Sequence, residues 1–224
     1  MTFITLVIPT QWRYNVSLSP HQLISIMNHT FSDFIYVADN TLTENFCQHV
    51  IKKFESDGAK EPGMVGRNEL KRVDKTIKDS IDLNISHFDE WKYEDQVFCD
   101  VLNKHIDLYL THTDILSDGY QHSLEDITDS GYQIQKTQPG GGYVWHHDSI
   151  QGEYIRENGA RWGTFIWYLN DIEKDGYTEF LDGTKVQPKT GRLCIFPALW
   201  TYYHRGYPPL DETKYIVTGW LHSN

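Results

Sequence analysis

The chain has 224 residues and a formal net charge of -11, a length that suits one domain of ordinary to large size. The acidic balance argues against a nucleic-acid backbone as the main partner, because phosphate binding needs clustered Lys and Arg. No apolar stretch approaches the length that crosses a bilayer, so no membrane partner is expected.

The cysteines indicate a reducing compartment. There are three of them, widely spaced and in no CxxC pair, so neither a disulfide framework nor a zinc ribbon is indicated. The apolar run at residues 3–9 lacks a basic region before it and a small-residue cleavage site after it. We therefore expect a cytoplasmic protein in which residues 1–30 form an N-terminal arm or extension of open role.

Two helices and a strand are predicted in the first half of the chain. Residues 34–37 form a compact β run, and Thr41 with Glu44 has the spacing of a capping box before an apolar helical stripe that Gly58 ends. A second apolar stripe predicts a helix over residues 89–112. These helices form the supporting part of the expected fold.

The stretch between the helices, residues 57–88, is rich in Gly, Asp, Lys and Asn. We expect a long exposed loop with one strand around residues 81–85. Loops of this length inside a compact domain tend to be functional or mobile.

From residue 131 on, short β segments alternate with turn signals such as Asp-Gly and Thr-Gly. The fold class this indicates is α+β and mainly β: a double-stranded β-helix, that is, a jelly-roll or cupin-like barrel, with the N-terminal helices packed on one face. We expect a single domain over 31–224, with helical support at about 39–112 and the barrel at about 131–222. The predicted strands cover residues 132–137, 143–148, 162–169, 177–181, 192–196, 201–205 and 215–221.

His146 and Asp148 are the first candidate metal ligands. Alternate residues of a strand share a face, so these two point to one spot while His147 points away. His204 stands in an aromatic strand further on, as a third ligand from another barrel strand would. Two histidines and one carboxylate leave coordination positions open, the arrangement of non-haem Fe(II) oxygenases. The alternatives are a solvated His-Asp pair and a core histidine satisfied by a hydrogen bond.

Lys214 points to a dicarboxylate ligand. A lysine on the interior face of a barrel strand needs an anion to pair with it, and a dicarboxylate co-substrate would supply one. Tyr168, in the preceding strand, could donate its hydroxyl to the same carboxylate; the alternative is a core aromatic with its hydroxyl at the rim. The residues that share the face of the last strand are Lys214, Ile216, Thr218, Trp220 and His222.

These residues together resemble the Fe(II)- and 2-oxoglutarate-dependent dioxygenases, specifically the prolyl 4-hydroxylase branch. The pattern of that branch is His-x-Asp, a distal His, a Lys ten residues later and a His eight residues after the Lys, and it is matched by His146, Asp148, His204, Lys214 and His222. The resemblance covers roughly residues 33–222, and supporting matches include Pro139-Gly140-Gly141, Arg161, Thr164, Tyr168-Leu169-Asn170, Gly176, Thr178 and Phe180.

The resemblance implies roles for ten residues. The catalytic Fe(II) ligands are His146, Asp148 and His204. The co-substrate 2-oxoglutarate is held by Lys214 and Tyr168 at its distal carboxylate, with His222 near its other end and Thr218 and Gln135 also on it, and the substrate is contacted by Arg161 and Trp220. O2 is the second co-substrate, ascorbate is a candidate reductant, and residues 73–85 resemble the family's substrate loop.

Two departures from the family pattern affect the co-substrate pose and the substrate. Thr137 stands nine residues before His146, where the family usually has a Tyr, and Gln135 is the candidate replacement for the lost hydrogen bond. Asp175 stands where the family's Gly-Gly-x-Thr-x-Phe element has its first Gly.

The expected reaction is hydroxylation of an unactivated C-H, foremost of a prolyl residue in a protein or peptide, with release of succinate and CO2. The same chemistry on another side chain, a free amino acid or a small molecule is the alternative. A non-catalytic cupin-like metal-binding barrel and a zinc hydrolase are the rivals from other classes, and the second lacks a candidate Glu beside the ligands. The sequence leaves the oligomeric state open.

Overall fold

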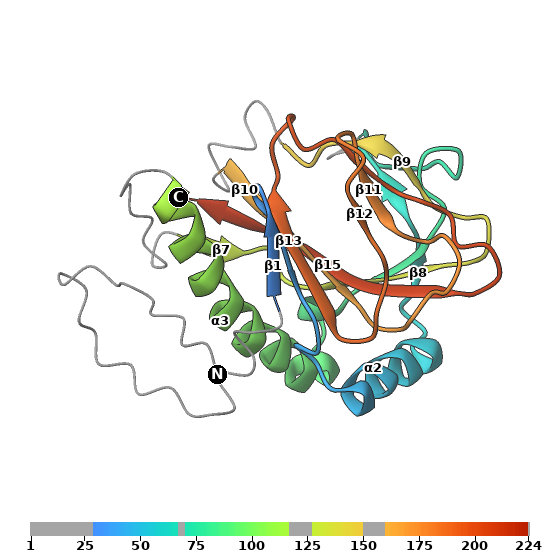
Figure 1. Cartoon of the computed structure of the whole chain (residues 1–224). Coiled ribbons are helices and arrows are strands. Elements are labelled where there is room, and N and C mark those ends of the chain that lie inside the picture. Colours follow the sequence, from blue (N-terminus) through green and yellow to red (C-terminus); the bar gives the residue numbers. More distant parts are fainter. Residues whose placement is uncertain (1–28, 67–69, 117–126, 150–159, 224) are drawn as a thin grey trace, which may run out of the picture.

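The structure is a computed structural model that describes residues 29–66, 70–116, 127–149 and 160–223 (Figure 1). The expected N-terminal arm lies outside these residues, apart from its last two, which belong to a strand. The described helices are α2 (Glu44–Ser56) and α3 (Lys92–Leu116), with two short 3-10 turns, η2 (Ile85–His87) and η3 (Asp89–Trp91), before α3.

Most strands belong to one antiparallel sheet, the major sheet, of nine strands in the order β1-β2-β13-β10-β15-β8-β6-β3, with β7 also paired to β15. Its members are β1 (His29–Ser32), β2 (Ile35–Ala38), β3 (Glu61–Pro62), β6 (Ile81–Asn84), β7 (Ile127–Asp129), β8 (Gln133–Thr137), β10 (Ala160–Tyr168), β13 (Arg192–Pro197) and β15 (Lys214–Ser223).

A second sheet, the minor sheet, has the order β12-β11-β14-β9. Its strands are β9 (Tyr143–His146), β11 (Thr178–Phe180), β12 (Lys185–Val186) and β14 (His204–Gly206). The two sheets share a buried cluster, because Phe180 and Val186 of the minor sheet pack with Ile166 and Phe196 of the major sheet. This mainly β organisation with few helices is confirmed, whereas closure into a barrel stays a prediction.

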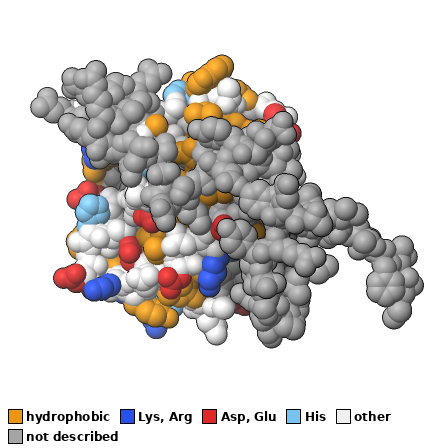
Figure 2. Space-filling view, turned by 90° about the vertical axis from the view of Figure 1, so that its left-hand side faces the viewer, with side chains coloured by type: hydrophobic (Ala, Val, Ile, Leu, Met, Phe, Trp, Pro, Cys, Tyr) orange, Lys and Arg blue, Asp and Glu red, His pale blue; other side chains and the backbone are white. Residues whose placement is uncertain are grey.

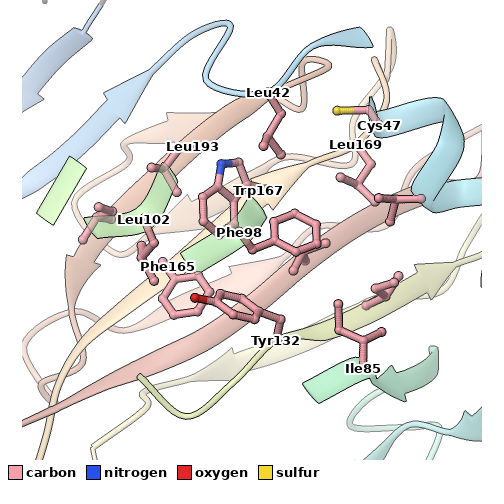
Figure 3. Packing of buried hydrophobic residues seen from close by; sticks show 14 of the residues in the cluster. Leu42, Cys47, Ile85, Phe98, Leu102, Tyr132, Phe165, Trp167, Leu169 and Leu193 are labelled. Atoms are coloured by element: carbon pink, nitrogen blue, oxygen red, sulfur yellow. The ribbon is translucent and has the colours of Figure 1, made fainter. Parts of the chain in front are cut away.

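Alternate side chains of β10 point to opposite faces of the major sheet and so belong to two different hydrophobic clusters. Phe165 and Trp167 lie in the larger cluster, which also contains buried residues of α2 and α3, while Ile166 and Tyr168 lie in the cluster between the sheets. Figure 3 shows Phe98 of α3 and Tyr132 directed at Trp167 and Phe165. The face of β10 that carries Thr164 and Ile166 lines the pocket of the candidate site.

The start of α2 differs from the expected one. Its N-cap is Thr43, whose hydroxyl accepts from the Phe46 N–H at 3.3 Å, and not Thr41. The hydroxyl of Thr41 instead donates to the Gly191 carbonyl at 2.8 Å, in a turn where Gly191 has φ 74°. A contact 150 residues away thus takes the side chain that the local spacing assigned to the cap.

The expected long loop at residues 57–88 contains more structure than predicted. The strand around 81–85 is confirmed as β6, but β3 and a separate hairpin of β4 (Met64–Val65) and β5 (Arg72–Val73) precede it. These strands are two residues long, too short to show period-2 alternation in a sequence.

Candidate active site

Two neighbouring strands of the minor sheet bring the three candidate ligands together. His146 at the end of β9 pairs in register with His204 at the start of β14, and Asp148 follows just after β9. The ligand atoms of the three residues lie within 4.8 Å of one another. The Nε2 atoms of His146 and His204 lie 3.9 and 3.7 Å from the Asp148 carboxylate oxygens. Two imidazoles and one carboxylate that converge in this way fit a divalent metal with open coordination positions.

Hydrogen bonds fix the orientation of each ligand. The Nδ1 atom of His146 donates to the Val144 carbonyl at 2.8 Å, and that of His204 donates to the Tyr202 carbonyl at 3.0 Å. Since a carbonyl only accepts, the Nε2 atoms carry the lone pairs that a metal requires. The Thr164 hydroxyl donates to Asp148 Oδ2 at 2.7 Å, which leaves Oδ1 for a metal.

The protonation of the cluster also suits metal binding. Burial, followed by the nearby His204, lowers the pKa of His146 to about 4. Burial alone would raise the pKa of Asp148, but the two imidazoles and the Thr164 hydrogen bond lower it below the usual value. Near neutral pH His146 is therefore a neutral imidazole and Asp148 is a carboxylate.

Lys214 lies in the pocket that the cluster opens into. It is 4% exposed and its ammonium donates to the Gly176 carbonyl at 2.8 Å, with no carboxylate within ion-pair distance among the described residues. Burial lowers the pKa of Lys214 to about 8. A cation held in this way has room for an anionic partner, as the sequence predicts.

Most residues predicted to bind the co-substrate are in or beside this pocket. Gln135 and Thr218 line it, although both donate hydrogen bonds within the protein: Gln135 donates to Gln133 Oε1, and Thr218 donates to the Phe165 carbonyl. Tyr168 lies behind it, where its hydroxyl donates to Thr178 Oγ1 at 2.7 Å. Tyr168 therefore does not line the pocket itself but is hydrogen-bonded to Thr178, which does.

Of the remaining predicted residues, Trp220 lines the pocket, whereas Arg161 and His222 do not. Arg161 stacks on Trp220, with its guanidinium carbon 3.6 Å from the ring centroid, and its Nη1 atom donates to the Asp148 carbonyl at 3.3 Å. His222 is 5% exposed. His147 points to another partner, since its Nδ1 bonds to the Ser149 hydroxyl at 2.6 Å.

Two lining features were missed in the sequence. Tyr143 stacks on His146 with ring centroids 3.7 Å apart. Lys78 and Ser80 also line the pocket, and both donate to the buried Asp82 carboxylate, at 2.5 and 2.8 Å. The Lys-x-Ser-x-Asp spacing before a predicted strand is the signal that could have found them, because it places the three on one face.

Two histidines and a carboxylate that converge beside a buried lysine in a two-sheet β fold are typical of non-haem Fe(II) oxygenases. A model of the 2OG-Fe(II) oxygenase superfamily matches residues 132–222. The chain is 26% identical over 120 residues to a probable prolyl 4-hydroxylase 3 of Arabidopsis thaliana, a match that covers 41% of this chain and 42% of the plant protein.

Solved structures with a similar fold include prolyl hydroxylases. A prolyl hydroxylase of Trichoplax adhaerens in complex with a hypoxia inducible factor peptide fragment has a TM-score of 0.63 at 18% identity, over 86% of this chain and 84% of that one. A viral collagen prolyl hydroxylase of Paramecium Bursaria Chlorella virus-1, in its 2OG complex, has a TM-score of 0.58 at 19% identity, over 86% and 97%.

The predicted resemblance to the prolyl 4-hydroxylase-like 2-oxoglutarate/Fe(II) oxygenases is confirmed by the family model and the plant relative, and the solved structures agree with it in fold. The cofactors of that family are Fe(II), 2-oxoglutarate and O2, as predicted, and the His-Asp-His cluster is a fitting iron site.

Proposed function

We propose that this protein hydroxylates an unactivated C-H, foremost of a prolyl residue in a protein or peptide, with release of succinate and CO2. The observation that carries the proposal is the pocket in which three convergent metal-ligand side chains meet a buried lysine. The names of the relatives support the prolyl assignment, as does the peptide bound to one of the similar structures.

The chain's own residues bind and orient the reactants in this proposal. His146, Asp148 and His204 hold Fe(II), which supplies O2 activation when 2-oxoglutarate is bound. Hydrogen bonds donated by the two Nδ1 atoms and accepted by Asp148 Oδ2 keep the three metal-ligand side chains convergent before any ion binds. No side chain is needed as a general base, because the hard chemistry belongs to the cofactor.

Lys214 binds the distal carboxylate of 2-oxoglutarate, with Tyr168 acting through Thr178 and with Thr218 and Gln135 along the pocket wall. Its neighbour in the β8–β15 register is Thr137, a small buried residue at the position where the family has Tyr. A threonine there leaves the lysine as the principal donor for this carboxylate, with His222 behind the pocket as a supporting residue.

Arg161 and Trp220 contact the substrate in this proposal. Their stacked pair lies beside Asp148, so a side chain resting on it faces the open coordination positions. Residues 73–85, which resemble the family's substrate loop, supply Lys78 and Ser80 to the same pocket. The single domain over 31–224, with the helices on one face of a closed barrel, belongs to the same proposal.

We also propose a cytoplasmic protein that acts on a protein or peptide, with ascorbate as reductant and with no nucleic-acid partner. All three cysteines are free, and two of them are buried, which suits a reducing compartment. On the face drawn in Figure 2, the described Lys and Arg side chains are scattered among Asp and Glu and form no basic patch. No described helix is long and apolar enough to cross a membrane.

The proposal is tested by anaerobic titration with Fe(II) and 2-oxoglutarate. We expect a visible charge-transfer band that is lost in Asp148→Ala, and succinate release on admission of O2. Mass spectrometry of proline peptides, and then of a cell lysate, should show the gain of one oxygen atom. Absence of the band in the wild type rejects the oxygenase assignment. Gain of oxygen only at residues other than proline rejects the prolyl assignment alone.

A further inference from the structure

A second hollow, separate from the metal pocket, lies between the β1–β2 turn, α3 and the segment that leads into β14. It encloses about 600 Å³, a volume typical of ligand sites. None of its lining residues is shared with the metal pocket. We call it the aromatic groove, because six of its lining residues are Phe34, Tyr109, Trp162, Phe180, Tyr202 and Tyr203.

The floor of the aromatic groove is packed and held by hydrogen bonds. The rings of Tyr109 and Trp162 meet edge to face at 5.5 Å, and the Tyr109 hydroxyl donates to the Phe34 carbonyl at 2.9 Å. At the open side, Leu181 and Leu199 are 66% and 49% exposed. The groove thus offers a rigid aromatic surface beside apolar side chains that are left in water.

The charge of the aromatic groove is negative. Asp33 and Asp182 are both exposed lining residues, neither has an ion pair in the described part of the chain, and the lining contains no Lys or Arg. Asp33 lies in the β1–β2 turn and Asp182 in the β11–β12 turn, so carboxylates from two separate turns border the same hollow. A cation bound in the groove would meet carboxylates and aromatic faces.

The aromatic groove leads to the metal strand. Tyr203 directly precedes His204, and its ring lies 5.0 Å from that of His147, the neighbour of the other histidine ligand. The Leu181 N–H donates to the Tyr203 carbonyl at 3.1 Å, which joins the β11–β12 turn to this segment. A chain bound along the groove is therefore directed towards the edge of the metal site.

We propose that the aromatic groove binds an extended polypeptide segment that places a basic side chain beside the carboxylates of Asp33 and Asp182, with apolar or prolyl residues on the aromatic floor. Extended proline-containing segments dock on aromatic-lined surfaces because their backbone is already ordered. The assignment of this segment to the substrate rests on the proposed function, whereas the binding itself does not.

The test uses fluorescence anisotropy of the full-length protein with a labelled peptide, Gly-Ser-Pro-Leu-Arg-Pro-Leu-Gly-Ser, and a matched peptide with Glu in place of Arg. We expect the Arg peptide to bind more tightly, and its affinity to fall about three- to tenfold in the double variant Asp33→Asn/Asp182→Asn. The loss should shrink in high salt, because the carboxylates are exposed. Asn suits both positions, since it tolerates the positive φ of residue 33 and can accept the turn hydrogen bond at 182.

Matched control variants test whether the effect belongs to the aromatic groove. The double variant Asp89→Asn/Asp107→Asn removes the same charge from exposed positions outside the groove and should bind like the wild type. Leu181→Ala/Leu199→Ala should weaken both peptides, whereas Leu210→Ala should weaken neither. Equal binding of the Arg and Glu peptides, no binding of either, or unchanged binding in the groove variants overturns the proposal.

Failure of the peptide-binding proposal can be distinguished from failure of the proposed oxygenase function. The charge-transfer band with Fe(II) and 2-oxoglutarate should be unchanged in the groove variants. If the wild type shows no band but binds the Arg peptide as expected, only the oxygenase assignment fails. If sedimentation velocity shows that the groove variants dissociate a dimer while peptide binding is unchanged, the groove is a self-association surface and the peptide proposal fails.

Discussion

At the scale of single residues, Thr164 is hydrogen-bonded directly to one of the proposed iron ligands, Asp148. It is 2% exposed, and its hydroxyl donates to Asp148 Oδ2 at 2.7 Å. We predict that Thr164→Val lowers Fe(II) affinity about 10- to 100-fold, because the carboxylate loses its orienting partner. Anaerobic Fe(II) titration measures this. Thr111→Val, which removes an exposed hydroxyl that bonds only to its own helix, should leave the affinity unchanged.

Lys214 should make co-substrate binding depend on pH. Its pKa is lowered to about 8 by burial, so the free protein carries a charged ammonium below pH 8 and loses it above. We predict that the affinity for 2-oxoglutarate falls as pH rises through about 8, and that Lys214→Met weakens binding at pH 7 and abolishes this dependence. Isothermal titration under anaerobic conditions measures both effects. An unchanged pH profile in the variant would contradict the assignment of Lys214 to the distal carboxylate.

The lowered pKa of Lys214 also makes the stability of the folded protein depend on pH. The folded pKa of Lys214 lies below the unfolded value of 10.5, so the unfolded chain binds more protons between pH 8 and 10.5. The buried Lys214 ammonium therefore lowers the free energy of unfolding below pH 8. This destabilisation diminishes as the pH rises from about 8 to 10.5. We predict that Lys214→Met stabilises the ligand-free protein at pH 7, measured by urea unfolding, and that the gain diminishes towards pH 10.

At the scale of elements, the pairing of β9 with β14 sets the distance between the two histidine ligands. On the outer face of the minor sheet, Arg205 bonds to Glu179 at 2.6 Å and lies over the ring of Trp145, with its guanidinium carbon 4.7 Å from the centroid. Arg205 and Trp145 are the chain neighbours of His204 and His146, so each ligand on the inner face is backed by a packed residue on the outer one.

The segment before β6 is held against β9 by backbone contacts and is joined to β6 by a buried ion pair. The Val144 N–H donates to the Ile77 carbonyl, and Lys78 bonds to Asp82 at 2.5 Å with side-chain exposures of 7% and 8%. We predict that Lys78→Met lowers the free energy of unfolding by about 3–5 kcal/mol, because it leaves a buried carboxylate without its partner. Urea unfolding measures this.

A double variant tests the cause of that loss. Lys78→Met/Asp82→Leu removes both charges and should recover much of the stability, since an ion pair replaced by apolar side chains is often neutral. The exposed pair of Lys174 with Asp211 gives the control, and Lys174→Met should leave stability unchanged. A double variant as unstable as the single one would show that packing of the Lys78 stem, and not the orphaned charge, causes the effect.

At the scale of the whole molecule, ligand binding should stabilise the fold, because the proposed site draws on strands far apart in the sequence. Its residues come from β8, β9, β10, β14 and β15, so the site exists only in the folded chain. We predict that 2-oxoglutarate at 100 times its Kd, with Fe(II) present and O2 absent, adds about 2.7 kcal/mol and raises Tm by about 5–10 °C. Differential scanning calorimetry measures this, and Asp148→Ala should remove the shift.

The candidate site was largely predictable from the sequence, and the supporting region was not. Period-2 alternation along a strand is a local property of the backbone, so it correctly places His146 and Asp148 together with His147 turned away. The expected strand at 201–205 is only partly present, because Tyr202 closes a turn by donating to the Leu199 carbonyl, and β14 begins at His204. Strand ends depend on such turns, which alternation does not reveal.

By itself, the sequence predicted the candidate ligand set, the interior lysine and the mainly β character, since each follows from residue type and spacing along one or two strands. Only the tertiary structure decided which threonine caps α2, which hydroxyl orients Asp148, and that Lys78 and Ser80 reach the metal pocket. It also assembled the aromatic groove from α3, several strands and the segments that connect them. These features depend on contacts between segments tens to more than a hundred residues apart, and the geometry of such contacts exists only once the sheets and helices have packed.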